Sequence, residues 1–436
     1  MVYVIMEGTN IVTTTAILVF VCTYILIVFG IVHRTVAALA GALIMLAIGV
    51  IKPVEAFVAL DFDTIGLLIG MMIIVGITKT TGLFEFLAVK AAKIARGEPV
   101  KILASLCLIT AVFSAFLDNV TTVMLIIPVT LAITRRLKLT PVPFLLAIII
   151  SSNIGGTATL VGDPPNLMIS GFTGMGFMDF FLNLAPIAAI IYIVTVYVMK
   201  SIFKHYLISL PALKQQVVKL NAQNELKDRA LLYKCLIIIL LTVLGFIFHQ
   251  KVKLEPAFIA VVGAAILLLI TNYNIISALK AVEWNVIVFF GSLFIMVGAL
   301  DKTGIFEGLA RTSLDITGGN ILLTGLIILW LSALFSSFID NIPFVAAMIP
   351  FIQDMGTIGG ITDLTFFWWS LSLGSCLGGN GTAVGASANI VVIGMAEKAG
   401  VHISFINFMK IGFPLMLLSM VLSTVYLLLW YFLNVM

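Results

Sequence analysis

Two stretches decide the fold, Ser114-Ala115-Phe116-Leu117-Asp118-Asn119 and Ser336-Ser337-Phe338-Ile339-Asp340-Asn341. Both lie inside strongly apolar sequence, and they are 222 residues apart. An aspartate in the hydrocarbon core of a bilayer costs roughly 2.5–3.5 kcal/mol on insertion scales. Because the chain carries this cost twice, in the same local sequence, we expect the two aspartates to serve its function.

The composition around these stretches is that of a membrane protein. Of 436 residues, 61% are hydrophobic and 10% are charged, and apolar runs of about 20 residues recur from end to end. The runs lack the alternation typical of a membrane barrel. The four cysteines show no CxxC spacing, so neither a disulfide framework nor a zinc site is expected. The fold class is therefore an all-α polytopic membrane protein, with no cleavable signal peptide expected at its start. The expected spans are 11–32, 35–51, 64–78, 141–172, 181–200, 231–248, 256–271, 284–300, 365–396 and 411–434.

Internal similarity divides the chain into two copies of one unit. At an offset of 222, residues 81–85 match 303–307 at four of five positions, and 114–128 match 336–350 at seven of fifteen. One residue of offset later, 152–166 match 375–389 at seven of fifteen. We therefore predict a duplicated unit of about 200 residues. The expected division is a first inverted repeat over 1–203, a cytoplasmic linker over 204–230 and a second inverted repeat over 231–436.

The Asp-Asn segments, 101–135 and 319–354, are interpreted as re-entrant helical hairpins. The apolar return arms run from Val120 to Ile133 and from Ile342 to Ile352, about 20 and 16 Å of helix. Neither length crosses roughly 30 Å of hydrocarbon. Tips at mid-depth are therefore expected, and a pair of full spans joined by a surface turn is the alternative.

The charges predict an orientation. Five spans and one hairpin per half force the two halves into opposite orientations. If both termini lie outside, the inner side receives 19 of the 24 Lys and Arg residues, Arg34 among them. This asymmetry follows the positive-inside rule, so a plasma or inner membrane location with 204–230 in the cytoplasm is expected. The net charge of +4 is then explained by the basic residues of the cytoplasmic side, and no nucleic-acid partner is expected.

The spans 141–172 and 365–396 are expected to break within the membrane. Glycines interrupt both, and Pro164-Pro165 removes two backbone donors from the first. Broken helices at matching positions of two inverted halves are the best sequence indication of a transporter's binding site. The candidate binding residues lie at the two tips and the two breaks: Asp118, Asn119, Thr121, Thr122, Asn153, Gly155, Gly156, Thr159, Gly162, Asp163, Asn166, Asp340, Asn341, Gly378, Gly379, Asn380, Thr382 and Asn389.

Oxygen ligands at these positions suit a small hard cation. One candidate sodium site combines Asp118, Asn119 and Gly156. Its counterpart combines Asp340, Asn341 and Gly379. Close helix packing is the alternative role for each glycine. No cofactor is expected beyond a bound sodium ion or a transported proton.

The sign of the charge narrows the chemistry. We place only Asp118, Asp163 and Asp340 among ionisable residues at membrane depth, with no Lys, Arg or His beside them. A buried aspartate can carry a proton or act as a charged ligand for a cation. Asp163 is matched by Ala386 in the second half, so it is expected to support only the first of two separate sites.

These motifs resemble the ion transporter superfamily that includes ArsB arsenite permeases, NhaD-type sodium/proton antiporters, the melanosomal P protein, plant silicon effluxers and the divalent anion/sodium symporters. Residues 117–122 and 155–166 look most like the P protein and ArsB/NhaD branch. The resemblance covers nearly the whole chain and is carried by motifs specific to the superfamily. It implies an inverted-repeat fold, a homodimer, and elevator-like movement of a transport domain.

The resemblance also bears on the substrate. In the symporters, Ser-Asn-Thr tips bind sodium and the substrate carboxylate, whereas the tips here are Asp118-Asn119-Val120 and Asp340-Asn341-Ile342. An acidic, arginine-free site suits cations, or a neutral hydroxide such as arsenous or silicic acid exchanged for protons. We therefore expect a secondary active transporter of the ArsB/NhaD type, performing sodium/proton exchange or arsenite-like efflux. A sodium-coupled di- or tricarboxylate symporter is the alternative, since a paired or protonated aspartate would admit an anion.

Two other classes are weighed against a transporter. An intramembrane aspartyl protease would need a GxGD motif, and Leu160-Val161-Gly162-Asp163 lacks its first glycine, so no enzyme activity is expected. An ion channel also uses re-entrant segments and acidic rings. No nucleotide-binding loop is present that could drive primary transport, and a soluble ATPase partner would leave no trace in this sequence.

Overall fold

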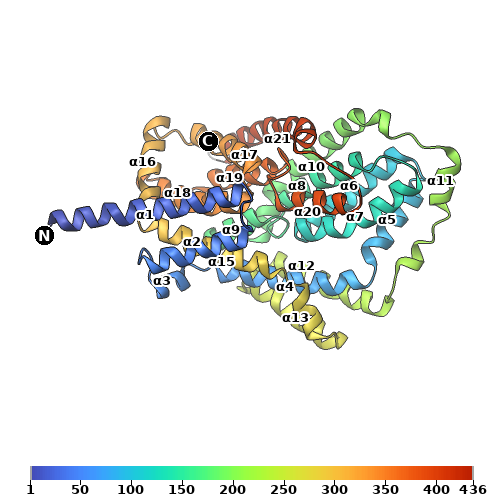
Figure 1. The fold of residues 1–436 in the computed structure, drawn as a ribbon, viewed down its shortest axis with the longest axis horizontal. Helices are drawn as coiled ribbons and strands as arrows, with labels where there is room; N and C mark the ends of the chain where they lie inside the picture. The colour runs from blue at the N-terminus through green and yellow to red at the C-terminus, as the bar shows by residue number, and fades with distance from the viewer. Residues whose placement is uncertain (1, 435–436) are drawn as a thin grey trace.

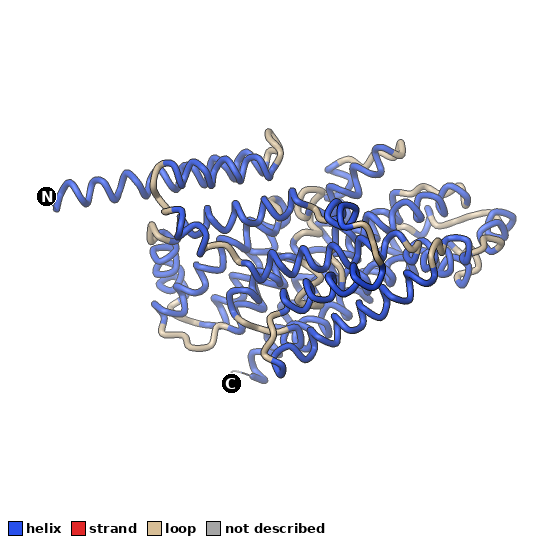
Figure 2. Tube along the Cα trace, turned by 90° about the horizontal axis from the view of Figure 1, so that it is seen from below, coloured by secondary structure: helices blue, strands red, loops and turns tan. Residues whose placement is uncertain are grey.

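The computed structural model describes residues 2–434, and the side chains of all of these except 2–11 and 28. Over this range the secondary structure is helical, with turns and loops between the helices and no strand (Figure 2). Most helices lie along the long axis of the molecule (Figure 1). This arrangement confirms the all-α fold class. Eight described helices are long and apolar enough to cross a membrane: α4 (Phe62–Thr80), α6 (Pro99–Phe116), α10 (Phe177–Ile202), α12 (Arg229–Val252), α15 (Trp284–Asp301), α17 (Ile321–Phe338), α18 (Asn341–Gly359) and α21 (Phe405–Asn434).

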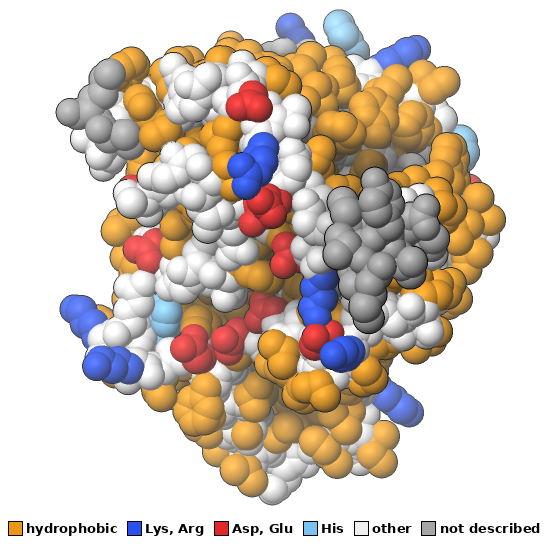
Figure 3. Space-filling view, turned by 90° about the vertical axis from the view of Figure 1, so that its left-hand side faces the viewer, with side chains coloured by type: hydrophobic (Ala, Val, Ile, Leu, Met, Phe, Trp, Pro, Cys, Tyr) orange, Lys and Arg blue, Asp and Glu red, His pale blue; other side chains and the backbone are white. Residues whose placement is uncertain are grey.

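The outer surface is apolar where lipid would contact it. Large hydrophobic side chains such as Val58, Leu269 and Leu433 are more than three-quarters exposed. In the end-on view of Figure 3, hydrophobic side chains lie along the upper, right-hand and lower edges, and the acidic side chains gather towards the middle of the face. Extensive exposed apolar surface of this kind is typical of a membrane-embedded protein.

Three further expected spans are also helical, and one of them, 256–271, has the expected bounds. They are α1 (Val2–Val28), α2 (Arg34–Ala47) and α13 (Pro256–Thr271). With 14 residues, α2 is about 21 Å long, shorter than the hydrocarbon is thick. Helices α1 and α2 pack against each other.

The Asp-Asn stretches interrupt the helices where the sequence predicts hairpin tips. Helix α6 ends at Phe116 and α7 (Asn119–Arg136) begins three residues later, while α17 ends at Phe338 and α18 begins three residues later at Asn341. The return arms are longer than expected, because α7 and α18 continue through internal prolines and α18 reaches Gly359. At 18 and 19 residues, α7 and α18 are about 27 and 28 Å long, so the expected return arms of about 20 and 16 Å are too short in both halves. The re-entrant depth of the tips stays a prediction.

Both predicted breaks are present. The first separates α8 (Val142–Thr157) from α9 (Pro164–Thr173), and the second separates α19 (Thr365–Gly378) from α20 (Ser387–Lys398). Nearly every residue of α8 and α19 is buried, so these two helices form the centre of the core. The breaks therefore lie in the protein interior, where irregular backbone is tolerated at membrane depth.

Five shorter helices were not expected from the sequence. They are α3 (Pro53–Val58), α5 (Leu83–Ile94), α11 (Pro211–Val218), α14 (Ile275–Ala281) and α16 (Ile305–Thr317). Helix α11 lies in the segment 204–230, the predicted linker. Helices α5 and α16 each follow a glycine in the left-handed region, Gly82 at φ 79° and Gly304 at φ 73°. This turn, repeated at offset 222, explains the matching sequence around it.

The two halves also repeat their packing. A Cβ on Gly155 of α8 would lie 2.2 Å from the carbonyl oxygen of Ala111 in α6, and one on Gly378 of α19 would lie 2.7 Å from that of Ala333 in α17. The same helix pair therefore makes the same close approach in each half. Figure 1 shows α16 at the left end of the molecule and α5 and α11 at the right. The inverted relation itself stays a prediction.

Candidate functional site

Six helices begin at one small cavity. Arg34, the first residue of α2, lines this cavity. The first residues of five other helices, or the residues just before them, complete its polar lining. These are Asp118 and Asn119 of α7, Asp163 and Pro164 of α9, Glu283 before α15, Asn341 of α18 and Ser387 of α20. The cavity volume, measured as the space open to the centre of a water-sized sphere, is about 20 Å³. This is room for one water molecule or one ion.

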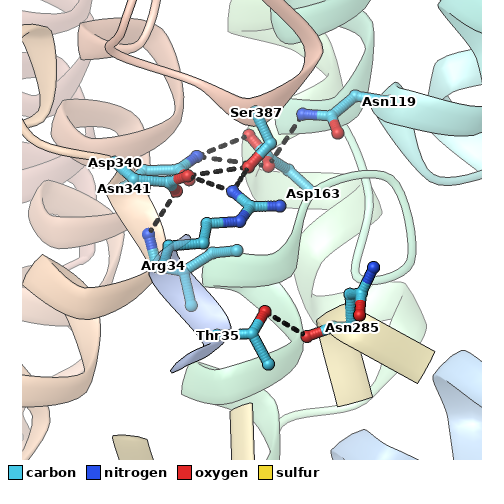
Figure 4. Close-up of polar contacts among 9 residues, drawn as sticks. Arg34, Thr35, Asn119, Asp163, Asn285, Asp340, Asn341 and Ser387 are labelled. Atoms are coloured by element: carbon cyan, nitrogen blue, oxygen red, sulfur yellow. Dashed lines mark hydrogen bonds and ion pairs between the residues drawn. The ribbon is translucent and has the colours of Figure 1, made fainter. Parts of the chain in front are cut away.

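Asp163 joins the two hairpin tips. Its side chain is completely buried, and its Oδ1 accepts a hydrogen bond from Nδ2 of Asn119 at 3.1 Å and from Nδ2 of Asn341 at 3.3 Å (Figure 4). The tips come from the two halves of the chain, so the prediction that Asp163 supports only the first copy is wrong. The amides of the two tips therefore meet at one shared carboxylate.

Arg34 corrects the prediction of an arginine-free site. Its Nη1 lies 2.7 Å from Oδ2 of Asp340 and also donates to the hydroxyl of Ser387 (Figure 4). The Ser387 hydroxyl in turn donates to Oδ2 of Asp340 at 2.7 Å. The Asp340 side chain is 7% exposed and that of Arg34 is 27% exposed, so this ion pair is largely buried.

Asp118 serves as the N-cap of α7. Its Oδ2 accepts hydrogen bonds from the backbone N–H of Thr121 at 3.0 Å and from the Thr121 hydroxyl at 3.2 Å. Glu283, which the sequence analysis missed, lines the same cavity as the residue before α15. The sequence does carry one signal for Glu283. It lies directly before an expected span, and it is 222 residues from Asp61, which precedes α4.

The asparagines at the breaks hold irregular backbone in place. Nδ2 of Asn166 donates to the carbonyl oxygens of Thr157 and Thr159, at 3.2 and 2.8 Å. In the second half, Nδ2 of Asn389 donates to those of Gly379 and Thr382, at 2.7 and 2.9 Å. These buried carbonyls lack helical donors, and the amides satisfy them. Neither asparagine lines the cavity described above.

The two threonines of the breaks fasten them to the hairpin tips. The hydroxyl of Thr159 donates to the carbonyl oxygen of Ala115, and that of Thr382 donates to the carbonyl oxygen of Ser337. Both contacts join a break to the last turn before a tip. They position the carboxylates and amides at the cavity.

A second buried polar cluster links α8 to the second break. Nδ2 of Asn153 donates to Oδ1 of Asn380 at 3.0 Å and to Oδ1 of Asn389 at 3.1 Å. Within the described structure, Oδ1 of Asn153, Nδ2 of Asn380 and the hydroxyl of Thr122 are buried without a hydrogen-bond partner. None of these three residues lines the cavity.

The glycines named as candidates have packing roles. Gly155 and Gly378 allow the close approaches of α8 and α19 described above. A Cβ on Gly156 would lie 2.7 Å from the carbonyl oxygen of Gly162, so these two permit the first break to fold back on itself, and Gly379 lies similarly against Gly385. Neither Gly156 nor Gly379 lines the cavity. No group of three His, Cys, Asp or Glu side chains in the part of the chain described here could hold a metal ion, and the two sodium sites stay predictions.

The electrostatics of the centre depend on the protonation of its carboxyls. Four acidic residues each directly precede a helix: Asp118, Asp163, Glu283 and Asp340. When ionised, they compensate the partial positive charge of the helix N-termini. With Arg34 as the one guanidinium, ionised carboxyls leave the centre acidic. Protonated carboxyls would leave six helix N-termini and a guanidinium, which attract anions. The same geometry can therefore bind a cation or admit an anion.

Comparison with known proteins places the chain among transporters. The family model described as CitMHS, citrate transporter, matches residues 24–374. A protein of Mycobacterium tuberculosis named an uncharacterized transporter is 42% identical over 422 residues, covering 96% of this chain and 98% of its own length. The 46 kDa membrane protein of Mycobacterium leprae is 42% identical over 421 residues, covering 95% of this chain and 98% of its own length.

More distant comparisons agree. The P protein of Mus musculus is 35% identical over 493 residues, covering 93% of this chain and 59% of that protein. The solved structure of the YdaH transporter of Alcanivorax borkumensis aligns with a TM-score of 0.59 at 14% identity, covering 86% of each chain. The structural likeness supports the fold. The resemblance to P protein is confirmed, whereas the ArsB/NhaD branch stays a prediction.

Proposed function

Because this chain belongs to the CitMHS citrate transporter family and is a multi-pass secondary transporter, we propose that it couples transport to a gradient of protons or sodium ions through Asp163 and the two hairpin tips. The observation that carries the proposal is the shared carboxylate. Asp163 is fully buried and contacts an amide from each tip. A change in its charge therefore alters contacts in both halves at once.

The surroundings of Asp163 favour a cation as the coupling ion. Four carboxyl groups and one guanidinium line or adjoin a cavity with room for one ion. A buried carboxylate in low dielectric attracts a cation or proton strongly, since water does not screen it. A proton on Asp163 or a sodium ion beside it would relieve the excess negative charge.

The preferred cargo is a small ion or a neutral oxyacid, moved by sodium/proton exchange or arsenite-like efflux. The cavity is far too small for a tricarboxylate in this conformation. Acidic side chains at the helix N-termini also occupy the positions that an anionic cargo would take. Elevator-like movement of the tips and breaks, a homodimer, and an inner-membrane location with both termini outside complete the proposal.

Sodium- or proton-coupled citrate transport is the second candidate. Arg34 favours it, because a guanidinium among six helix N-termini provides a site for a carboxylate once Asp340 is neutralised. The description of the family favours it as well. In this case the aspartates bind the coupling cations, and the cargo enters after them.

The test is flux into proteoliposomes under imposed gradients. We expect a proton or sodium gradient to drive flux of sodium, arsenite, silicate or citrate, and the cargo that moves decides between the two candidates. Asp163→Asn is expected to abolish coupled flux, and Asp118→Asn and Asp340→Asn to suppress it. Wild-type coupling in Asp163→Asn would refute the proposal. Single-channel currents would instead indicate a channel, because alternating access cannot pass ions at channel rates.

A further inference from the structure

The carboxylate of Asp340 forms an ion pair with the guanidinium of Arg34. Oδ2 of Asp340 is held from two sides, by Nη1 of Arg34 at 2.7 Å and by the hydroxyl of Ser387 at 2.7 Å. Arg34 also donates to the Ser387 hydroxyl, so the three residues form one hydrogen-bonded network (Figure 4). The guanidinium thus lies where an external cation would bind Asp340.

The position of Arg34 on its own helix is unfavourable for a cation. It is the first residue of α2, where the helix dipole repels a positive charge. Its guanidinium carbon lies 5.2 Å from the ring centre of Phe289, which offers a modest cation–π attraction. The ion pair with Asp340 is therefore the principal interaction that holds the guanidinium at the cavity.

The other charged groups around Asp340 are acidic. The cavity beside it is lined by Asn341, the residue that follows Asp340, and by three acidic residues, Asp118, Asp163 and Glu283. Arg34 is the one basic side chain in this lining. A proton or sodium ion that reaches the cavity therefore competes with Arg34 alone for Asp340.

We propose that Arg34 is a tethered counter-ion, which occupies Asp340 when the site holds no coupling ion and leaves when Asp340 binds a proton or a sodium ion. This inference rests on the proposed function, since it takes the coupling ion from there. It adds a second ion-binding carboxylate, Asp340, with a built-in competitor.

Displacement of Arg34 would change the packing of the centre. Arg34 belongs to α2, which packs against α1 and α15, whereas Asp340 and Ser387 begin α18 and α20. The ion pair is thus a link between α2 and the second tip and break. Binding of a cation breaks this link, so the tip becomes free to move away from α2 only after the ion has bound.

Competition predicts a measurable shift in affinity. If the pair is formed about nine-tenths of the time, Asp340 is free about one-tenth of the time, and the apparent affinity for the ion is weakened roughly tenfold. Arg34→Gln keeps an amide that can reach Ser387 but removes the charge. We expect it to lower the sodium midpoint of thermal stabilisation about tenfold in the purified full-length protein. In sodium-free buffer, the proton midpoint should move up by about one pH unit.

Arg311→Gln is the matched control. Arg311 pairs with Glu307 at the same distance of 2.7 Å, but on the exposed surface of α16. It should leave both midpoints unchanged. Arg34→Lys keeps the charge and should keep the midpoints within about twofold of wild type, consistent with a competing cation. Adding Asp340→Asn to Arg34→Gln should remove the shift.

The outcomes separate this inference from the proposed function. If gradient-driven flux is present but Arg34→Gln has the wild-type midpoints, the counter-ion role is refuted and the function stands. If flux is absent but the midpoints shift as expected, the function is refuted and the counter-ion role stands. Should Arg34→Gln fail to fold, hydrogen exchange in wild type decides. Faster exchange at residues 34–40 on adding sodium or acid supports displacement, and unchanged exchange overturns it.

Discussion

The shared hydrogen bonds to Asp163 can be tested by a double-mutant cycle on Asn119 and Asn341. Both amides are at least 97% buried and donate to the same carboxylate oxygen, at 3.1 and 3.3 Å. A hydrogen bond contributes about 0.5–1.5 kcal/mol to a neutral acceptor and about 1.5–3 kcal/mol to a charged one, so the range for Asp163 is about 0.5–3 kcal/mol. Asn119→Ala and Asn341→Ala should therefore each lower the free energy of unfolding by that amount.

The double variant should lose more than the sum of the two. With one amide removed, the buried carboxylate keeps one of its two amide donors, and removing that one leaves it poorly satisfied. Residues that share a partner show coupling of about 0.5–3 kcal/mol, whereas distant independent sites add within about 0.5 kcal/mol. The assay is unfolding of the purified protein in mixed micelles titrated with denaturing detergent.

A control cycle pairs Asn119→Ala with Asn183→Ala. Asn183 lies in α10 and accepts a hydrogen bond from Nε1 of Trp430 at 2.8 Å, so it shares no partner with Asn119. This pair should be additive. An additive result for Asn119 and Asn341 as well would show that the two tips do not depend on one carboxylate, and would refute the central geometry.

Three further variants test other parts of the structure. Gly155→Ala should lower the free energy of unfolding by about 1–3 kcal/mol, because its Cβ would lie 2.2 Å from a backbone oxygen of α6. The control is Gly394→Ala in α20, whose Cβ would meet no atom within 4 Å. In thermal unfolding this control should be neutral or stabilising. Asp163→Asn should elute from gel filtration as wild type but lose gradient-driven flux in proteoliposomes, and retained flux would contradict its coupling role. Thr382→Val should lose about 0.5–1.5 kcal/mol in the same unfolding assay, because it removes one hydrogen bond to the second tip, and should keep the sodium midpoint.

The breaks and tips were predictable because their causes are local. Pro164-Pro165 and the glycines of 155–162 disfavour a helix whatever surrounds them. An aspartate followed by asparagine ends one helix and caps the next, as Asp118 does for α7. The duplicated sequence then implied that the second half would break at the same positions, and it does.

The charge at the centre was not predictable from composition. Arg34 lies between two apolar runs, where an arginine ordinarily marks the membrane surface. Only the approach of the start of α2 to the second tip gives it a partner in Asp340. Glu283 was missed for the same reason, since its sequence neighbours do not show that α15 begins at the cavity.

The sequence by itself determined the membrane class, the duplication, and the positions of tips and breaks. These follow from transfer free energies and backbone preferences that each segment carries on its own. The tertiary structure alone decided which carboxylates share a partner. Asp163 receives an amide from each half, and Asp340 is held by Arg34, 306 residues away in the chain. Such contacts depend on how helices pack, and packing joins residues that no local pattern relates.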